Sequence, residues 1–199
     1  MKFLISASQW IDKLSILIGR GLIWLVLVAV LLSAGNAIVR KTLNTSSNAM
    51  LEIQWYLFAA VFMLGAGYAF LRNAHVRIDF VSNHLSPRAR NWIDVLGILF
   101  VLIPFCVMMI DFSWPLFLRA WQSGEMSQNA GGLIRWPVLL FMPLGFLLLM
   151  LQALSELVKR VAFLRGLATD SIPAGNGDET PEVVREIEIH AQHAREAVR

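Results

Sequence analysis

The stretch RNAHVRIDFVSNHLSPRAR, residues 72–90, separates two long apolar runs and concentrates charge between them. It contains four arginines, two histidines and one aspartate, whereas residues 53–71 before it and 95–110 after it contain no charged side chain. A charged segment between two apolar runs of this length is typical of a loop that joins two transmembrane helices. The stretch therefore predicts a helical hairpin in a membrane.

The whole chain is as apolar as this hairpin predicts. Of its 199 residues, 57% are hydrophobic and only 16% are charged, and the mean hydropathy is +0.61; soluble domains have roughly a quarter of charged residues. Uncharged runs near the ~20 residues needed to cross a bilayer occupy residues 21–39, 53–71, 95–110 and 136–155. We therefore expect an all-α membrane protein with four transmembrane helices, forming a transmembrane domain over residues 1–166.

The third run is the shortest, and its flanking residues extend it. Ser86 followed by Pro87 is typical of a helix N-cap and first helical residue, so the third helix is expected to start there. Pro104 lies inside the run and predicts a kink, because proline removes a backbone hydrogen bond from the helix.

A short helix is also predicted between the second and third spans. His75 and Asp79 stand one helical turn apart on one face. An apolar stripe follows at helical spacing: Ile78, Val81 and Leu85. This pattern predicts an interfacial helix that lies in the headgroup layer.

The distribution of positive charge predicts the orientation of the chain. With the N-terminus inside, ten lysines and arginines flank the membrane on the cytoplasmic side and four lie outside. The four outer residues are Arg40, Lys41, Arg119 and Arg135. The positive-inside rule therefore favours cytoplasmic N- and C-termini. If the first helix starts near Leu14, Arg20 snorkels to the headgroups; the alternative is a buried charge on an ion pathway.

The composition changes after the fourth run. Residues 167–199 are rich in Gly, Pro and acidic residues and then become a polar segment with a thin apolar stripe. Thr180 followed by Pro181 is a helix-start signal. We expect a polar linker and a short cytoplasmic helix.

The histidines and the single cysteine argue against a cofactor site. All four histidines lie outside the apolar runs: His75, His84, His190 and His193. Haem in a helical bundle needs histidines inside the helices, and one cysteine, Cys106, cannot form an intramolecular disulfide or a cysteine metal site. We expect no catalytic residue, no cofactor, no metal and no nucleic-acid partner, and hence no enzyme.

Charge is also missing from the middle of the runs, where a carrier acting alone binds its substrate and ion. The acidic residues near the membrane lie at the ends of runs: Glu52, Asp94, Asp111 and Glu156. Gly65 and Gly67, inside the second run, are expected to permit close approach of a neighbouring helix.

Several of these features occur together. Glu52 and Trp55 stand at the head of the second helix, Gly65 and Gly67 follow, and then come the segments LRNAHVRIDF (71–80) and LSPRARNWID (85–94). In a chain of four spans this combination resembles the small membrane subunit, the DctQ-like subunit, of tripartite ATP-independent periplasmic (TRAP) transporters. The resemblance covers about residues 15–165.

The resemblance implies a division of labour in a bacterial inner membrane. A periplasmic substrate-binding protein captures an organic acid, and a large membrane subunit carries it across by a sodium-coupled, elevator-like movement. The small subunit packs against the fixed scaffold of the large one. The main alternative is a self-sufficient homo-oligomeric four-helix channel or exporter.

The resemblance also implies which residues contact the large subunit or phospholipid. They are Glu52, Trp55, Arg72, His75, Arg77, Asp79, Arg88 and Arg90. For the loop residues the alternative is a solvated, lipid-facing loop. For Glu52 it is a favourable interaction with the helix dipole, and for Trp55 the aromatic belt. The outer loop between the third and fourth spans either meets the binding protein or forms a folded cap over the large subunit.

Overall fold

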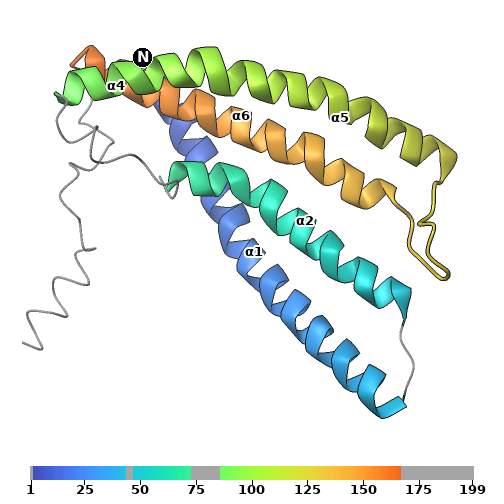
Figure 1. Cartoon of the computed structure of the whole chain (residues 1–199). Helices are drawn as coiled ribbons and strands as arrows, with labels where there is room; N and C mark the ends of the chain where they lie inside the picture. The colour runs from blue at the N-terminus through green and yellow to red at the C-terminus, as the bar shows by residue number, and fades with distance from the viewer. Residues whose placement is uncertain (1, 44–46, 73–85, 167–199) are drawn as a thin grey trace, which may run out of the picture.

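The computed structural model describes residues 2–43, 47–72 and 86–166, and these form a helical array (Figure 1). The elements are α1 (Lys2–Leu43), α2 (Asn48–Leu71), α4 (Pro87–Gly97), the π-helical turn η1 (Ile98–Leu102), α5 (Ile103–Ser123) and α6 (Trp136–Leu164). Because α4, η1 and α5 are continuous, the described residues contain four helical segments long and apolar enough to cross a membrane. The all-α, four-span prediction is thus confirmed. The predicted interfacial helix (75–85) and tail (167–199) lie outside the described residues.

The first helix is longer than predicted. It begins at Lys2 rather than near Leu14. Ser8, within this added length, is buried against α6, as is Ser15 on the same face just after it. The extension is therefore held by packing against a helix that is distant in sequence, which an apolar-run analysis cannot detect.

The start of the third span is the one the sequence predicts. Pro87 is the first helical residue, and the hydroxyl of Ser86 accepts a hydrogen bond from the Ala89 N–H at 3.3 Å. A kink was predicted at Pro104, and the third span contains the π-helical turn η1, which ends two residues before this proline. A π turn widens the helix ahead of the proline, whose ring would otherwise press on the carbonyl one turn earlier.

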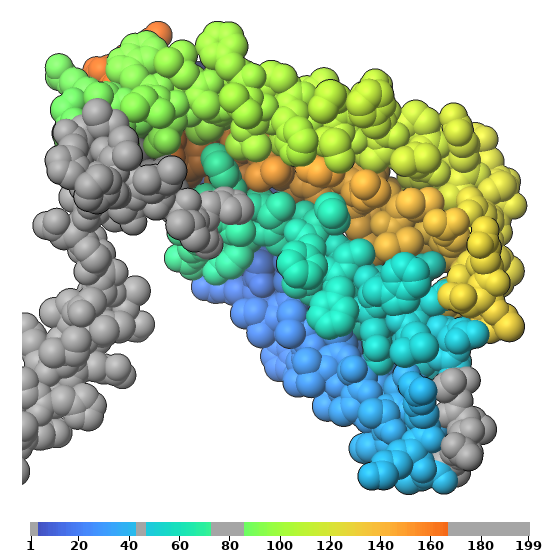
Figure 2. All heavy atoms as spheres, in the orientation of Figure 1, coloured from blue at the N-terminus to red at the C-terminus, as the bar shows by residue number. Residues whose placement is uncertain are grey.

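Helix α6 is the centre of the array. It packs against α1, α2, α4 and α5, while α2 packs against α1 on the other side. Figure 1 shows α6 lying between the long α4–α5 rod and the α1–α2 pair, which diverges from the rod toward its far end. The space-filling view shows the loop after α5 resting against the start of α2 (Figure 2). The arrangement is an open, fanned array.

The apolar residues buried inside this array are mostly small. The fully buried apolar residues include Ala29, Ala60, Ala120, Ala153 and Ala162. Lipid tails are as apolar as leucine, so large apolar residues gain little by turning inward, and small ones let helix backbones approach closely.

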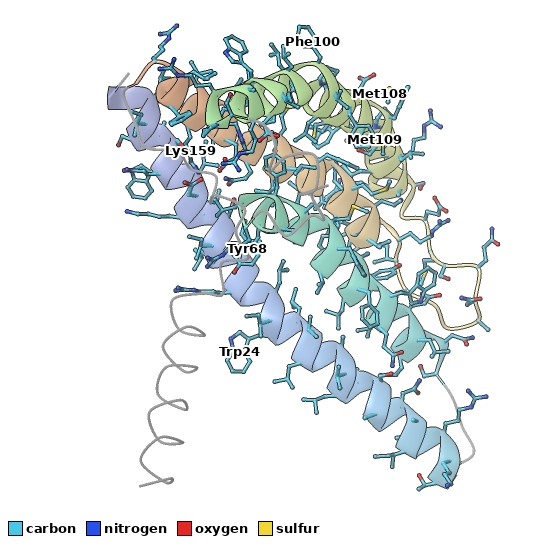
Figure 3. All side chains as sticks on the ribbon, turned by 60° about the vertical axis from the view of Figure 1, so that its left-hand side comes forward. Trp24, Tyr68, Phe100, Met108, Met109 and Lys159 are labelled. Atoms are coloured by element: carbon cyan, nitrogen blue, oxygen red, sulfur yellow. The ribbon has the colours of Figure 1, made fainter. Side chains whose placement is uncertain are left out.

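Large apolar side chains cover the outer faces instead. Trp24 on α1 is 70% exposed and Phe100 in η1 is 69% exposed. Figure 3 shows Trp24 and Phe100 pointing away from the neighbouring helices, from opposite sides of the array. Both outer helices therefore present apolar surface to lipid or to another protein.

Glycines set the spacing between the central helices. The close approach predicted for Gly65 and Gly67 is confirmed: a Cβ at Gly65 would lie 3.2 Å from Leu22, and one at Gly67 would lie 3.2 Å from the carbonyl oxygen of Leu148. Gly145 on α6 is tighter still, since a Cβ there would lie 2.5 Å from the carbonyl oxygen of Met63. Only glycine fits at Gly145 without moving a backbone.

We predict that Gly145→Ala destabilises the protein by about 1–3 kcal/mol, because the added methyl group forces α2 and α6 apart. The matched control is Gly21→Ala, since a Cβ at Gly21 meets nothing within 4 Å. Thermal unfolding in detergent, followed by tryptophan fluorescence, measures both variants. Equal unfolding midpoints for the two would contradict this account of the α2–α6 contact.

Candidate functional site

Polar side chains gather at the two ends of the array, and each group joins helices that are far apart in sequence. We call them the Glu52 cluster (Glu52, Ser127, Asn129 and Leu133) and the Asp12 cluster (Ser8, Asp12, Ser15, Asp94, Gln152, Ser155, Glu156, Lys159 and Arg160). The bundle ends that carry them are called the Glu52 end and the Asp12 end.

The carboxylate of Glu52 is buried beneath the loop between α5 and α6. The side chain is 1% exposed. Its Oε1 accepts hydrogen bonds from the Ser127 hydroxyl and, at 2.9 Å, from the Asn129 amide, and its Oε2 accepts one from the Leu133 N–H at 2.6 Å. The sequence left a helix-dipole role and a contact role open for this residue, whereas the structure gives it a specific set of partners within the chain.

The loop itself is a small folded hairpin. Met126 pairs with Ile134 in an antiparallel bridge, and the Ser127 N–H donates to the Leu133 carbonyl at 2.8 Å. Gly131 has φ of 71°, a left-handed conformation that glycine adopts without strain. A Cβ at Gly132 would lie 2.5 Å from Ser127 Cβ. These glycines let the hairpin close tightly over Glu52.

Two further contacts seat the hairpin on α2. The Asn48 amide donates to the Ala130 carbonyl at 2.9 Å, and the Tyr56 hydroxyl donates to the Ile134 carbonyl at 3.1 Å. Three residues from the first turns of α2, namely Asn48, Glu52 and Tyr56, therefore bind the hairpin. The Glu52 cluster makes the α5–α6 connection a rigid cap on α2.

At the opposite end, hydroxyl and amide groups join α1 to α6. The Ser15 hydroxyl donates to the Gln152 side-chain oxygen at 2.7 Å, and the hydroxyls of Ser8 and Ser155 are 2.7 Å apart. Asp12 Oδ1 accepts hydrogen bonds from the Gln152 amide and the Ser155 hydroxyl, each at 2.9 Å. The three α1 residues are spaced four and three apart, so they share one face of the helix.

Ion pairs extend this contact from α1 to α4. Lys159 lies 2.7 Å from both Asp12 Oδ2 and Glu156 Oε1, and Figure 3 shows Lys159 near the crossing of α1 and α6. Arg160, only 2% exposed, pairs with Asp94 of α4 and lies 3.7 Å from Glu156 Oε2. Charged residues of α6 thus bind an outer helix on each side.

The Asp12 cluster was not predicted from the sequence. Lys159 and Arg160 were counted only among the ten basic residues expected on the cytoplasmic side, and Asp94 and Glu156 were predicted only to lie at the ends of apolar runs. The available signal was the helical spacing of Ser8, Asp12 and Ser15 and the matching polar spacing from Gln152 to Lys159.

The residues predicted to contact the large subunit or lipid do not form one site. Glu52 and Trp55 are on the first turns of α2, where Trp55 is 57% exposed and packs edge-on against Tyr56. Arg72 is at the other end of α2, exposed, with its Nε 3.2 Å from the Tyr68 hydroxyl.

The remaining predicted residues belong to the loop and the start of the third span. Arg88 is exposed and Arg90 half-buried, both in the first turn of α4. His75, Arg77 and Asp79 lie outside the described residues. The basic residues Arg72, Arg88 and Arg90 are thus carried by helix ends that flank one connection.

Both clusters join helices, and the charged groups of the Asp12 cluster that line a pocket, Asp94 and Arg160, are paired with each other. Their carboxylates already accept hydrogen bonds or ion pairs from within the chain. Over residues 2–43, 47–72 and 86–166, no group of three or more His, Cys, Asp or Glu side chains is arranged to hold a metal ion. The geometry suits a fixed frame.

The fold and its two clusters define a multi-pass membrane protein with a rigid helical frame. Residues 29–163 match the family described as "Tripartite ATP-independent periplasmic transporters, DctQ component". The chain therefore belongs to the DctQ family, the small component of TRAP transporters, and this is a family of transporter components rather than of enzymes. Comparison with curated proteins gave no match, and comparison with solved structures gave none.

We predict that Glu52→Leu releases the hairpin from α2, because three hydrogen bonds to its carboxylate disappear. Loss of one hydrogen bond to a charged group is enough to raise the amide exchange rate of Leu133 about tenfold. Hydrogen exchange with mass spectrometry over residues 124–135 measures this. The control is Glu125→Gln in the same hairpin, which breaks only the exposed ion pair with Arg135. Equal exchange in both variants would refute a holding role for Glu52.

We predict that Arg160→Met destabilises the protein by roughly 3 kcal/mol or more, because it leaves the Asp94 and Glu156 carboxylates without their shared cation. Arg165→Met is the control, since Arg165 directly follows α6 at the same end, is exposed, and forms no ion pair with another described residue. The thermal unfolding midpoint in detergent reports both. A midpoint for Arg160→Met as high as that for Arg165→Met would contradict a structural role for this ion pair.

Proposed function

We propose that this chain is the fixed scaffold subunit of a TRAP-type secondary transporter. In this proposal it packs against the large elevator subunit in a bacterial inner membrane. The complex takes up an organic acid, coupled to sodium, after delivery by a periplasmic binding protein. Membership of the DctQ family supports both partners.

The observation that carries the proposal is the small share of each span that the chain buries by itself. In the most apolar window of each span, between 11% and 28% of the residues are buried. Most of the membrane-facing surface is therefore left for lipid or for another subunit. The polar side chains of the Glu52 and Asp12 clusters are bonded within the chain at the two ends of the array.

Rigidity is the second requirement of a scaffold. An elevator subunit needs a frame that does not move with it. The hairpin fixed on α2 and the ion pairs between α1, α6 and α4 cross-connect the array at both ends. Glycine contacts between α2 and α6 hold its middle.

The proposed orientation places both termini in the cytoplasm, on the basis of the positive-inside rule. The Asp12 end then faces the cytoplasm and the Glu52 end faces the periplasm. The hairpin over Glu52 would be available to the large subunit or to the binding protein, and the polar tail would lie in the cytoplasm.

The eight predicted contact residues fall into two groups in this orientation. On the cytoplasmic side, phospholipid headgroups or the large subunit would be contacted by a basic group: Arg72, His75, Arg77, Asp79, Arg88 and Arg90. On the periplasmic side, the exposed ring of Trp55 would make a direct contact. Glu52 would act indirectly, by holding the hairpin in place.

The test is to tag the C-terminus, extract the chain from its native membrane in mild detergent, and identify what remains bound by mass spectrometry. We predict a large polytopic membrane protein in near-equal amount. The double variant Arg72→Glu with Arg77→Glu should lower the recovery of that partner. The control is Arg119→Glu, because Arg119 is an exposed arginine near the end of α5.

Recovery of the chain alone, or only of further copies of it, would overturn the scaffold proposal. That result would favour a homo-oligomeric channel or exporter. Transport by the purified chain in vesicles would then confirm the alternative.

A further inference from the structure

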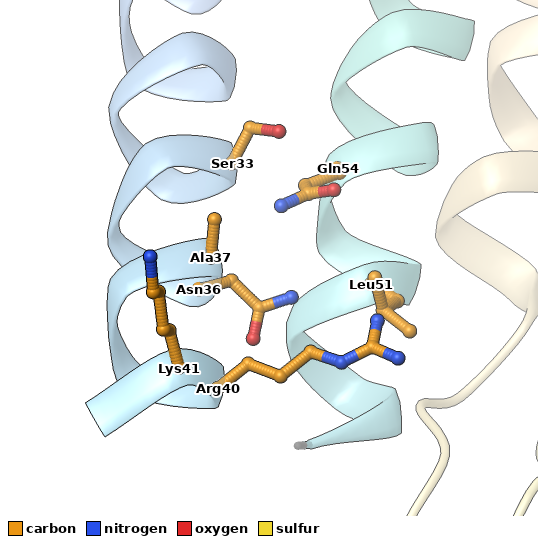
Figure 4. Close-up of a pocket in the computed structure, with 7 residues that line it drawn as sticks. All are labelled: Ser33, Asn36, Ala37, Arg40, Lys41, Leu51 and Gln54. Atoms are coloured by element: carbon orange, nitrogen blue, oxygen red, sulfur yellow. The ribbon is translucent and has the colours of Figure 1, made fainter. Parts of the chain in front are cut away.

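An open pocket of about 510 Å³ lies between the end of α1 and the start of α2, at the Glu52 end (Figure 4). Its volume is within the range of roughly 300–1,000 Å³ typical of ligand pockets. The lining residues are Ser33, Asn36, Ala37, Arg40, Lys41, Leu51 and Gln54. Two of these are cations, three are neutral polar residues and none is a carboxylate.

The polar side chains of this pocket have no partners within the chain. Asn36 is only 8% exposed, yet its amide makes no hydrogen bond to another described residue, and the same holds for the side chains of Ser33 and Gln54. Figure 4 shows the Asn36 and Gln54 side chains projecting from the two helices into the space between them. Polar groups that face an open pocket without a partner in the chain are free to exchange hydrogen bonds with a polar ligand, which a membrane environment favours.

The charge of the pocket specifies an anion. Arg40 and Lys41 form no ion pair with any residue in the described ranges. Figure 4 shows Arg40 reaching from α1 toward α2 beside Leu51. The nearest acidic residue in sequence, Glu52, has its carboxylate occupied by the hairpin. The positive charge at the pocket mouth is therefore not neutralised by the chain.

The flanks of the pocket specify an apolar tail on that anion. Leu51, which lines the pocket, is 43% exposed on α2, one turn before the exposed ring of Trp55. A lipid whose headgroup enters the pocket can lay its acyl chains on these side chains. A soluble anion would gain nothing from them.

We propose that this pocket binds the headgroup of one anionic phospholipid of the phosphatidylglycerol type. Arg40 and Lys41 bind the phosphodiester, and Asn36, Gln54 and Ser33 exchange hydrogen bonds with the headgroup hydroxyls. Basic pockets between membrane helices recognise lipid headgroups in this way. The site is separate from the basic residues of the 72–90 stretch and does not depend on the proposed scaffold role.

The test is native mass spectrometry of the full chain in detergent, titrated with phosphatidylglycerol or with phosphatidylcholine of the same acyl chains. We expect one tightly held phosphatidylglycerol per chain and no comparable phosphatidylcholine. Since each basic contact near a membrane surface is worth about fivefold in affinity, Arg40→Gln should bind roughly fivefold more weakly. The double variant Arg40→Gln with Lys41→Gln should bind about thirtyfold more weakly.

Two control variants separate this site from general attraction to charge. Arg119→Gln removes an exposed cation from α5 and should bind phosphatidylglycerol like the wild type. Arg40→Lys keeps the charge and should retain most of the affinity. Unfolding midpoints near that of the wild type show that each variant is folded.

Three results would overturn the proposal. The first is equal retention of phosphatidylglycerol by the double variant, and the second is an equal loss in Arg119→Gln. The third is displacement of the lipid by equimolar sn-glycerol 3-phosphate, which has the headgroup chemistry without acyl chains and would assign the pocket to a soluble anion.

Discussion

The ion pair between the buried Arg160 and the partly exposed Asp94, with Lys159 and Asp12 beside it, joins α6 to α4 and α1, and the rest of the array is arranged around α6. In lipid, an apolar side chain gains little by facing another helix, so apolar burial does not choose one arrangement over another. Charged and polar groups do favour one helix arrangement, because leaving such a group unpaired away from water costs free energy. Four long helices are thus positioned by a few polar side chains at their ends.

The Glu52 cluster applies the same principle at the other end. One carboxylate gathers two side-chain donors and a backbone N–H from a hairpin whose glycines permit a tight fold. Between the two clusters, Gly67 and Gly145 bring α2 and α6 into backbone contact. Hydrogen bonds and ion pairs join the helices at both ends, and glycines allow close packing in the middle. The outer faces of the helices can therefore be apolar. A subunit that supports a moving partner needs this combination.

The pocket between α1 and α2 departs from that pattern. The polar side chains of the two clusters are joined to partners within the chain, but here Asn36 and Gln54 face an open space beside two cations. Side-chain contacts join the helices at both ends of the array, but at the Glu52 end the end of α1 borders this open pocket. A lipid headgroup in the pocket would complete the fastening between α1 and α2, so that the surrounding membrane would contribute to the rigidity of the frame.

The sequence by itself determined the four spans, the helix start at Ser86 and Pro87, the irregularity before Pro104 and the family, because run length, capping and motif spacing are local properties of the chain. Tertiary structure alone decided the start of α1, the order of the helices and the partners of Glu52, Asp12 and Arg160. Those depend on which distant helix faces a given residue. In a membrane, apolar periodicity does not report that choice, because lipid and protein interiors are equally apolar.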